Sequence, residues 1–128
     1  MVSKQAVFTA NSPKPRPQLS QAIISNGMVY CSGQLGVDPK TSKLVEGTVQ
    51  DRARQVLRNL SAVLEAAGTS LDNAVKVNIF LTSMDNFVAV NEVYDEFFTA
   101  APKPCRTCVA VHQLPQGSDV EIELTASL

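Results

Sequence analysis

The sequence has very few of the residue types from which metal sites are built. It contains one histidine, His112, and three cysteines, Cys31, Cys105 and Cys108. Cys105 and Cys108 have the C-x-x-C spacing, but no second Cys/His pair accompanies them to complete a zinc site. We therefore expect no metal and no cofactor, and we interpret His112 as a polar residue at the end of a strand.

Long apolar runs are absent as well, because no segment approaches the length that crosses a bilayer. The first residues resemble neither a secretory signal nor an arginine-rich transit sequence. An odd number of cysteines suits free thiols in a reducing compartment. These features predict a cytosolic protein that does not contact a membrane and has no disulfide framework.

An excess of positive charge is also lacking, since 11 Lys and Arg residues face 12 Asp and Glu residues. The basic residues are scattered, so a surface that follows a phosphate backbone would have to be assembled by folding. The composition gives no electrostatic reason to expect nucleic acid as a partner. At 128 residues, the chain fits one domain over residues 1–128, which is long enough to bury a core without a metal ion or disulfide bonds.

Alternating or β-favouring segments predict a series of strands. They lie at residues 5–9, 21–25, 28–32, 44–45, 74–82, 106–111 and 120–125. Asn26 and Gly27 tolerate positive φ and predict a tight hairpin between the second and third of these strands. Three prolines between residues 11 and 17 predict an extended arm that lies over the surface.

Two segments have helical periodicity instead. The first begins at Val49 and ends before Gly68, with Thr48 and Asp51 as a capping box and Gly68 as a left-handed cap. The second spans about residues 85–99. Its apolar positions are Phe87, Val90, Tyr94 and Phe97.

The order of elements is strand, hairpin, helix, strand, helix and two strands, which predicts an α+β fold. Each helix has one apolar stripe, so we expect both to pack on one face of a single mixed sheet. In the strand at 74–82, Val75, Val77, Ile79 and Leu81 should share one face. The other face of the sheet carries mixed residues, which we expect to include Asn78, Phe80, Cys108 and Glu121, and it requires a partner.

The last two strands contain the residues most suited to chemistry. Alternation puts Arg106 and Cys108 on one face of the first strand, and Glu121 and Glu123 on one face of the second. An arginine can grip a carboxylate with two parallel hydrogen bonds. It can equally form an ordinary surface ion pair with Glu121 or Glu123, and both interpretations are open from the pattern alone.

A family resemblance favours the first interpretation. Residues 104–111, Pro-Cys-Arg-Thr-Cys-Val-Ala-Val, followed by Val-Glu-Ile-Glu at 120–123, resemble the C-terminal signature of the RidA/YjgF family of reactive-intermediate (2-iminoalkanoate) deaminases. Further blocks are similar in the same order, at residues 20–22, 30–36, 66–68, 75–81 and 87–98. The resemblance implies a chorismate-mutase-like fold and a homotrimer, with a central β-barrel and sites between subunits.

The resemblance also implies a reaction. The family hydrolyses 2-imino acids such as 2-iminobutanoate and 2-iminopropanoate, or their enamine tautomers, to 2-oxo acids and ammonia, a form of metabolite damage control. Arg106 would clamp the substrate carboxylate, and Glu121 would hold the attacking water or move a proton. Ser32, Gly33, Asn91 and Cys108 complete the implied binding site, in addition to the two catalytic residues.

One position departs from the family pattern, because Leu19 stands where relatives commonly have tyrosine. The phenol that would border the substrate is absent, so turnover or side-chain preference is expected to differ. Two alternatives remain: an RNA-directed translation inhibitor with endoribonuclease activity, and a regulatory protein that binds a small ligand without catalysis. Some family members are mitochondrial, which makes the mitochondrion the alternative to the cytosol.

Overall fold

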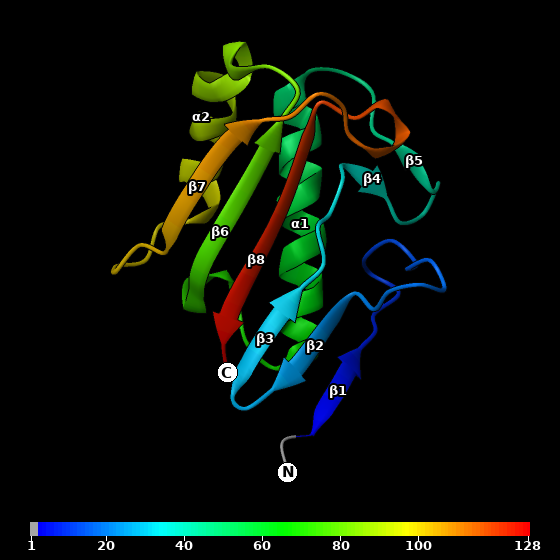
Figure 1. Ribbon diagram of the computed structural model, residues 1–128, viewed down its shortest axis with the longest axis vertical. Helices are drawn as coiled ribbons and strands as arrows, with labels where there is room; N and C mark the ends of the chain where they lie inside the picture. The colour runs from blue at the N-terminus through cyan, green and yellow to red at the C-terminus, as the bar shows by residue number, and fades with distance from the viewer. Residues whose placement is uncertain (1–2) are drawn as a thin grey trace.

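The computed structural model describes residues 3–128 and contains one six-stranded sheet beside a small two-stranded one (Figure 1). The strand order of the large sheet is β1 (Lys4–Val7), β2 (Ala22–Ser25), β3 (Met28–Cys31), β8 (Val120–Ser127), β6 (Ala74–Leu81) and β7 (Cys105–Ala110). Only β6 and β7 are parallel, so the predicted mixed sheet is confirmed. The small sheet pairs β4 (Val37–Asp38) with β5 (Lys43–Leu44), and the sequence predicted only the second of these strands.

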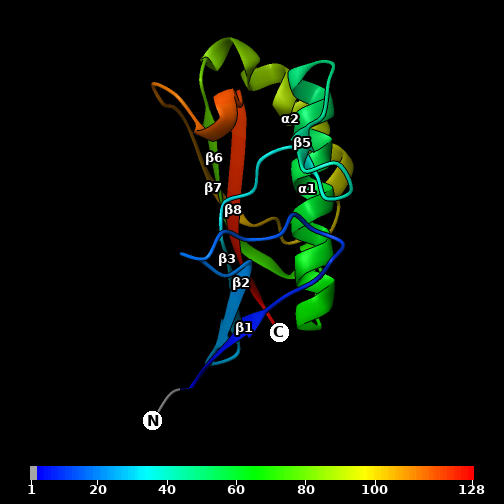
Figure 2. The same ribbon diagram turned by 90° about the vertical axis from the view of Figure 1, so that its right-hand side faces the viewer.

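Both helices, α1 (Val49–Ala67) and α2 (Phe87–Phe97), lie on one side of the sheet, as predicted (Figure 2). Thr48 and Asp51 form the predicted capping box, and Gly68 ends α1 with φ 93°. The second helix is shorter than expected at both ends, because residues 85 and 86 belong to the 3-10 turn η2 (Met84–Asn86) and the helix ends at Phe97 instead of residue 99. Two further turns, η1 (Leu71–Asn73) and η3 (Pro115–Gly117), precede β6 and β8.

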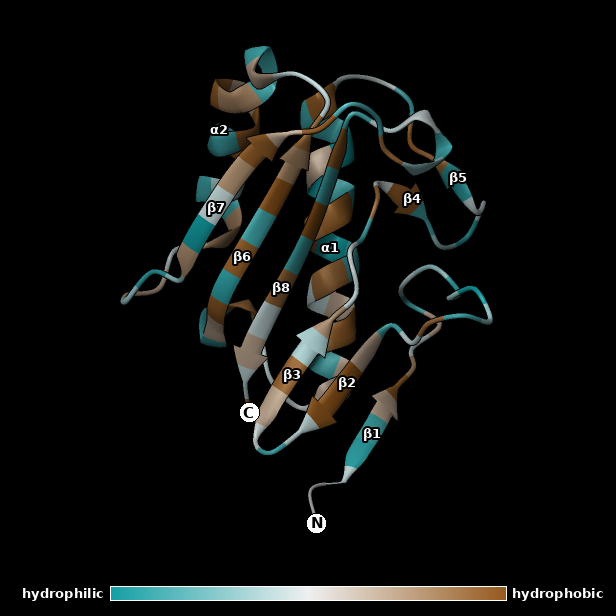
Figure 3. Ribbon diagram, viewed as in Figure 1, coloured by the Kyte–Doolittle hydropathy of each residue, from teal (hydrophilic) through white to brown (hydrophobic). Residues whose placement is uncertain are grey.

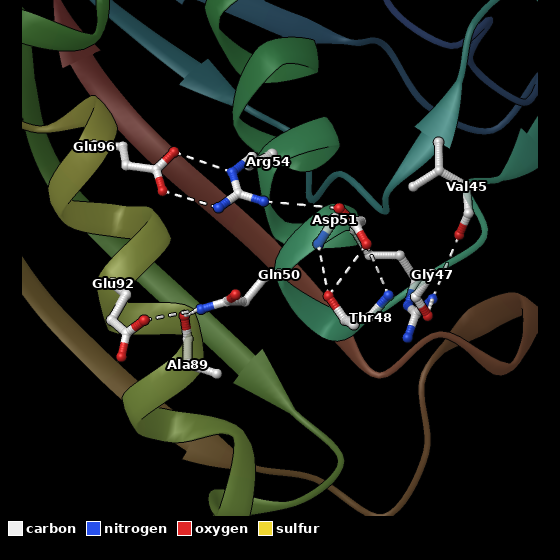
Figure 4. A network of polar contacts seen from close by, with 10 residues as sticks. Val45, Gly47, Thr48, Gln50, Asp51, Arg54, Ala89, Glu92 and Glu96 are labelled. Atoms are coloured by element: carbon white, nitrogen blue, oxygen red, sulfur yellow. Dashed lines mark hydrogen bonds and ion pairs between the residues drawn. The ribbon is translucent and has the colours of Figure 1, made fainter.

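Polar contacts join the two helices along their outer surfaces (Figure 4). Arg54 donates two hydrogen bonds of 3.0 Å to the carboxylate of Glu96. Gln50 donates to the backbone carbonyl of Ala89 at 3.0 Å and to the carboxylate of Glu92 at 3.1 Å. Exposed pairs of this kind contribute at most about 1 kcal/mol each, so they orient the helices more than they hold them.

The core between the helices and the sheet supplies the larger stabilisation. Its residues alternate along β6 and β8 and recur every three or four positions along α1 (Figure 3). Leu60 and Val63 of α1 meet Ile79 and Ile122 in this cluster, and all four are at most 1% exposed. Because each buried methylene contributes about 0.8 kcal/mol, this packing fixes which sheet face the helices cover.

Two expectations about faces are wrong. Val75 does not join Val77 in the core but is 46% exposed, because the pairing with β8 shifts between Ala74 and Lys76 and buries Ala74 instead. Cys108 does not lie on the open face of the sheet. It is paired in register with Ile79, on the helix side, and packs against the core.

The hairpin is formed as predicted, with φ of 51° at Asn26 and 77° at Gly27 and Ser25 paired with Met28. The first strand covers Lys4–Val7, two residues fewer at its C-terminal end than expected. The next segment, residues 9–20, has no helix or strand and includes the three prolines. Within residues 3–128, no helix has the length and apolar character needed to cross a membrane.

Candidate functional site

Glu121 lies on the sheet face that the helices leave open. Its neighbours on β8, Val120 and Ile122, are fully buried under the helices, so alternation directs Glu121 the other way. It is paired in register with Phe80 of β6. The carboxylate opens into a cavity of about 460 Å³. The segments that line this cavity are residues 13–16, 32–35 and 115–116, together with Leu19, Gln21, Val37, Ser42 and Glu121.

Gly33 lies next to the carboxylate of Glu121. A Cβ atom added at Gly33 would lie 2.7 Å from Glu121 Oε2, so only glycine leaves the carboxylate in place. The segment is fixed beside β8 because Gln34 and Ile122 exchange backbone hydrogen bonds of 2.8 and 3.2 Å. The sequence nominated the Gly33 backbone for the substrate pocket, which stays a prediction, and the structure adds that the missing side chain leaves space for the Glu121 carboxylate.

Burial raises the pKa of Glu121 above the usual range of a glutamic acid, and the charge of Glu123 on the same face raises it further. Glu123 itself accepts a hydrogen bond of 3.2 Å from the side-chain amide of Asn78. A carboxyl group with a raised pKa exchanges its proton closer to neutral pH. This property suits a group that takes a proton and returns it.

Ser32 lines the same cavity, but its hydroxyl has a structural partner. Its Oγ donates to the backbone carbonyl of Ser20 at 2.6 Å, and its N–H donates to the carbonyl of Gln21 at 3.0 Å. The hydroxyl proton is therefore used in a hydrogen bond within the protein, so the hydroxyl of Ser32 can only accept a hydrogen bond from a ligand. Among the described residues, the Gly33 N–H has no protein acceptor, which makes it the better donor of the two.

Two polar contacts, one buried and one partly buried, hold segments beside the cavity. Asn59 of α1 is 1% exposed and donates to the carbonyls of Leu35 and Val37 at 3.2 and 2.8 Å. Arg52 binds the carboxylate of Asp119 through two hydrogen bonds of 2.7 Å. These bonds lower the pKa of Asp119 and attach the turn that precedes Glu121 to α1.

Arg106 lies on the helix side of β7, in register with Val77. Its Nη1 donates to the side-chain oxygen of Asn91 at 2.7 Å, and its guanidinium carbon is 4.7 Å from the ring centroid of Tyr94 and 5.8 Å from that of Phe87. Such cation–π contacts hold the guanidinium plane without using its N–H groups. The sequence predicted the arginine and asparagine, whereas the role of the two rings was hidden in an apolar helical stripe.

The alternative in which Arg106 pairs with Glu121 or Glu123 is wrong, because both carboxylates lie on the other sheet face. Within residues 3–128, no carboxylate is within ion-pair distance of Arg106. A second cavity of about 290 Å³ opens beside it, between α2 and the segment before β7. The guanidinium is thus oriented, and among the described residues most of its five N–H groups make no hydrogen bond to the protein.

Cys108 shares the face of Arg106 but is a poor nucleophile. Burial raises the pKa of its thiol, and the charge of Arg106 opposes this only in part. The thiol of Cys31 is further from reactivity, since burial raises its pKa to about 12. Cys105 is exposed and donates to the carbonyl of Val75. These environments favour the prediction that Cys108 does not attack a substrate. Cys108 borders neither of the two cavities, so its place in the lining of a site stays a prediction.

The six predicted site residues therefore form two groups. Ser32, Gly33 and Glu121 are together at the large cavity. Asn91 and Arg106 are together beside α2, and Cys108 shares the sheet face of Arg106 two residues along β7. Within one chain the groups lie on opposite faces of the sheet. Sequence reasoning missed Lys14 and Arg16 of the cavity rim, and the only signal for them was the proline-rich arm to which they belong.

Comparison with known proteins identifies the family. The family model of endoribonuclease L-PSP matches residues 9–128. The mitochondrial protein mmf1 of Schizosaccharomyces pombe is 52% identical over 121 residues, which cover 91% of this chain and 73% of that protein. A protein of Dermatophagoides farinae named 2-iminobutanoate/2-iminopropanoate deaminase is 41% identical over 123 residues, covering 96% of this chain and 95% of the relative.

Solved structures superpose on almost the whole of this chain. A Rid-family protein of unknown function from Yersinia pestis superposes with a TM-score of 0.96 at 42% identity, covering 98% of this chain and 100% of the other. Escherichia coli TdcF, solved with bound serine, gives a TM-score of 0.91 at 35% identity and covers 97% and 98% of the two chains. The resemblance to RidA/YjgF proteins is thus confirmed, and the chain belongs to the endoribonuclease L-PSP family.

Proposed function

We propose that the protein hydrolyses 2-imino acids to 2-oxo acids and ammonia, in sites where the Arg106 group of one chain meets the Glu121 cavity of another. The observation that carries this proposal is the division of the two groups. An oriented guanidinium with uncommitted donors and a carboxyl group with a raised pKa are both present, and each is incomplete in its own chain. The deaminase name of the Dermatophagoides farinae relative supports the choice of reaction.

In this reaction, Arg106 binds the substrate carboxylate through two parallel hydrogen bonds, while Asn91 keeps the guanidinium in orientation. Binding in this way fixes the adjacent C=N carbon with respect to Glu121. The Gly33 N–H, and the backbone beside Cys108, are the further donors for the carboxylate or for developing charge. The site requires no cofactor for these steps.

Glu121 then moves one proton. It removes a proton from water as the water oxygen bonds to the imine carbon, which gives a carbinolamine. It returns the proton to nitrogen, and as the C–N bond breaks the hydroxyl proton passes to the departing ammonia, which leaves the oxygen as the 2-oxo group and releases ammonium. Water and iminium acid are consumed, and 2-oxo acid and ammonium are produced. The raised pKa of Glu121 suits both directions of this transfer.

A cyclic oligomer, with three chains as the family resemblance implies, would bring the two groups together. The open sheet face supports such an assembly, since Phe80, Asn78 and Thr125 are only partly buried there. Tyr30, on a neighbouring strand, is 49% exposed. A second chain on this face would bury these residues and close the cavity at Glu121.

Mixed oligomers test the proposal. The Arg106→Ala and Glu121→Gln variants are each expected to be inactive, and mixing them under conditions of subunit exchange should restore about a quarter of wild-type activity, because one interface in four then has both residues. The control is each variant alone, at the same total concentration and taken through the same exchange procedure. No recovery after proven exchange contradicts sites between chains, and no acceleration of imine loss by the wild type contradicts the deaminase.

Binding without catalysis is the second candidate, because TdcF was solved with serine bound and Leu19 replaces a phenol at the cavity. It predicts saturable binding of small amino or 2-oxo acids that depends on Arg106, with no loss of imine beyond the buffer rate. If the protein is instead an endoribonuclease, it should cleave RNA, and the Arg106→Ala variant should keep this activity. The net charge of −1 gives it little support.

A further inference from the structure

The segment between β1 and β2, residues 9–20, forms one wall of the large cavity although it has no regular structure. We refer to these residues as the arm. Its prolines have no backbone N–H, so the arm cannot be held by pairing with a strand. Pro13, Pro15 and Leu19 nevertheless line the cavity together with Lys14 and Arg16. Something outside the arm must fix its conformation.

Gln21 does so with a single side chain. Although polar, it is only 1% exposed, and its Oε1 accepts the N–H of Thr9 at 2.7 Å. Its Nε2 donates to the carbonyls of Thr9 and Pro13 at 3.0 and 2.9 Å, and makes a longer bond of 3.4 Å to Ser12. Both ends of the amide are therefore used, and they join Thr9 and Pro13, which flank the turn at residues 10–12 in the first part of the arm, to the start of β2.

The apolar part of this wall consists of Pro13, Pro15 and Leu19, which lie beside the cationic Lys14 and Arg16 and line the same cavity as Glu121. Leu19 is 48% exposed, which leaves much of its side chain open to the cavity that Glu121 enters. Cavities of about 300–1,000 Å³ hold ligands much larger than a four-carbon acid, and this one measures about 460 Å³. A substrate fixed through its carboxylate and C=N group has space for a side chain that reaches the arm.

We propose that Gln21 is a positioning residue that holds the arm as an apolar wall, and that Leu19 on this wall selects 2-imino acids with long apolar side chains. The inference rests on the proposed deaminase function and names its substrate preference. Contact with Leu19 removes apolar surface from water only when the substrate side chain is long enough. Short imino acids gain nothing from the wall.

Leu19→Ala tests the wall directly, and because Leu19 is half exposed the fold should be retained. The ratio of kcat/KM for the leucine-derived imino acid to that for the alanine-derived one should fall about 10-fold, which is the usual effect of losing apolar contact in a pocket. The loss should appear mainly as a higher KM for the leucine-derived substrate. An unchanged ratio overturns the role of Leu19.

Gln21→Met tests the positioning role, since methionine has nearly the same length and none of the hydrogen bonds. We expect the same fall in the substrate ratio, because without these hydrogen bonds the arm no longer holds Leu19 in place. Gln18→Met is the matched control: Gln18 is an exposed arm residue that does not line the cavity, and its substitution should leave the ratio unchanged. A Gln21→Met enzyme with the wild-type ratio overturns the positioning role.

Two readouts separate this inference from the proposed function. Hydrogen exchange of the Thr9 amide should quicken in Gln21→Met and not in Gln18→Met, because this amide donates to Gln21. Binding of 4-methyl-2-oxopentanoate and 2-oxobutanoate, measured by NMR titration, tests the wall without turnover. A wild-type protein that hydrolyses no imino acid but prefers the longer oxo acid refutes the deaminase and retains the wall. Equal affinity for the two acids overturns the wall.

Discussion

The Glu121 cavity and the Arg106 group differ in how their key residue is held. Glu121 is partly desolvated beside a like charge, so its environment raises its pKa and favours the neutral form. Arg106 is held by an amide and two aromatic rings, which fix its direction without neutralising it. One region prepares a group to exchange a proton and the other prepares a permanent charge to bind an anion. This difference is the basis of our proposal that each region forms one half of a site between two chains.

Among substitutions in these two regions, Glu121→Gln should lower the catalytic activity most. We expect kcat for imine hydrolysis to fall by about 10²–10⁴-fold, the usual contribution of a general acid–base group, while KM changes little. Steady-state rates with the alanine-derived imino acid give both constants. A fall in kcat/KM that comes entirely from KM would instead assign Glu121 to binding.

The same variant should unfold at a higher temperature at neutral pH. A carboxyl group whose pKa is raised in the folded protein contributes stability below its unfolded pKa and loses it as pH rises through the folded value. The ionised Glu121 therefore destabilises the fold at neutral pH, and the neutral glutamine removes this effect. Thermal unfolding at pH 7 and at pH 4 measures the change, which should be larger at pH 7.

Arg106→Lys should have the next largest effect, mainly on KM. Lysine keeps the charge but loses the planar fork and its stacking on Tyr94, so carboxylate binding and orientation both weaken. We expect kcat/KM to fall about 10²-fold. Asn91→Ala, which leaves the guanidinium present but without its orienting partner, should give a smaller loss of the same kind. Equal losses in kcat and kcat/KM with unchanged KM would contradict a binding role.

Gly33→Ala should lower activity about 10-fold by displacing the carboxylate of Glu121, since the added methyl group would lie 2.7 Å from Oε2. The nearest atoms belong to the end of a flexible side chain, so the fold should tolerate the change. In the Glu121→Gln background the same substitution should have little further effect on kcat. Independent, additive losses would show that Gly33 acts on the substrate and not on Glu121.

Glu123→Gln should have the smallest effect, a shift in pH dependence. The ionised form of Glu121 is required to take a proton from water, so the rate falls as pH drops through the pKa of Glu121. Removing the charge of Glu123 lowers that pKa and moves the acid limb of the profile to lower pH. The measurement is kcat/KM against pH, and an unmoved limb would mean that Glu121 does not set it.

Sequence patterns predicted most elements because they depend on local periodicity. The four-and-three spacing from Val49, the capping box at Thr48 and the Asn26–Gly27 turn each specify a conformation within a few residues, and all are present. The failures arose where pairing with a distant strand decides. Val75 looked like a core residue, but a register shift beside β8 exposed it.

The sequence by itself determined which chemical groups the protein has: a strand arginine, a strand glutamate, a glycine at the end of β3 and an amide in the second helix. It could not determine which of these groups lie on the same side of the sheet. Alternation shows which residues of one strand share a face, but it does not show which face of that strand is covered by the helices. Both faces of β7 contain small or apolar residues, so its sequence has no preference. Only the register on β6, with Ile79 opposite Cys108 and Phe80 opposite Glu121, put Arg106 and Glu121 on opposite sides.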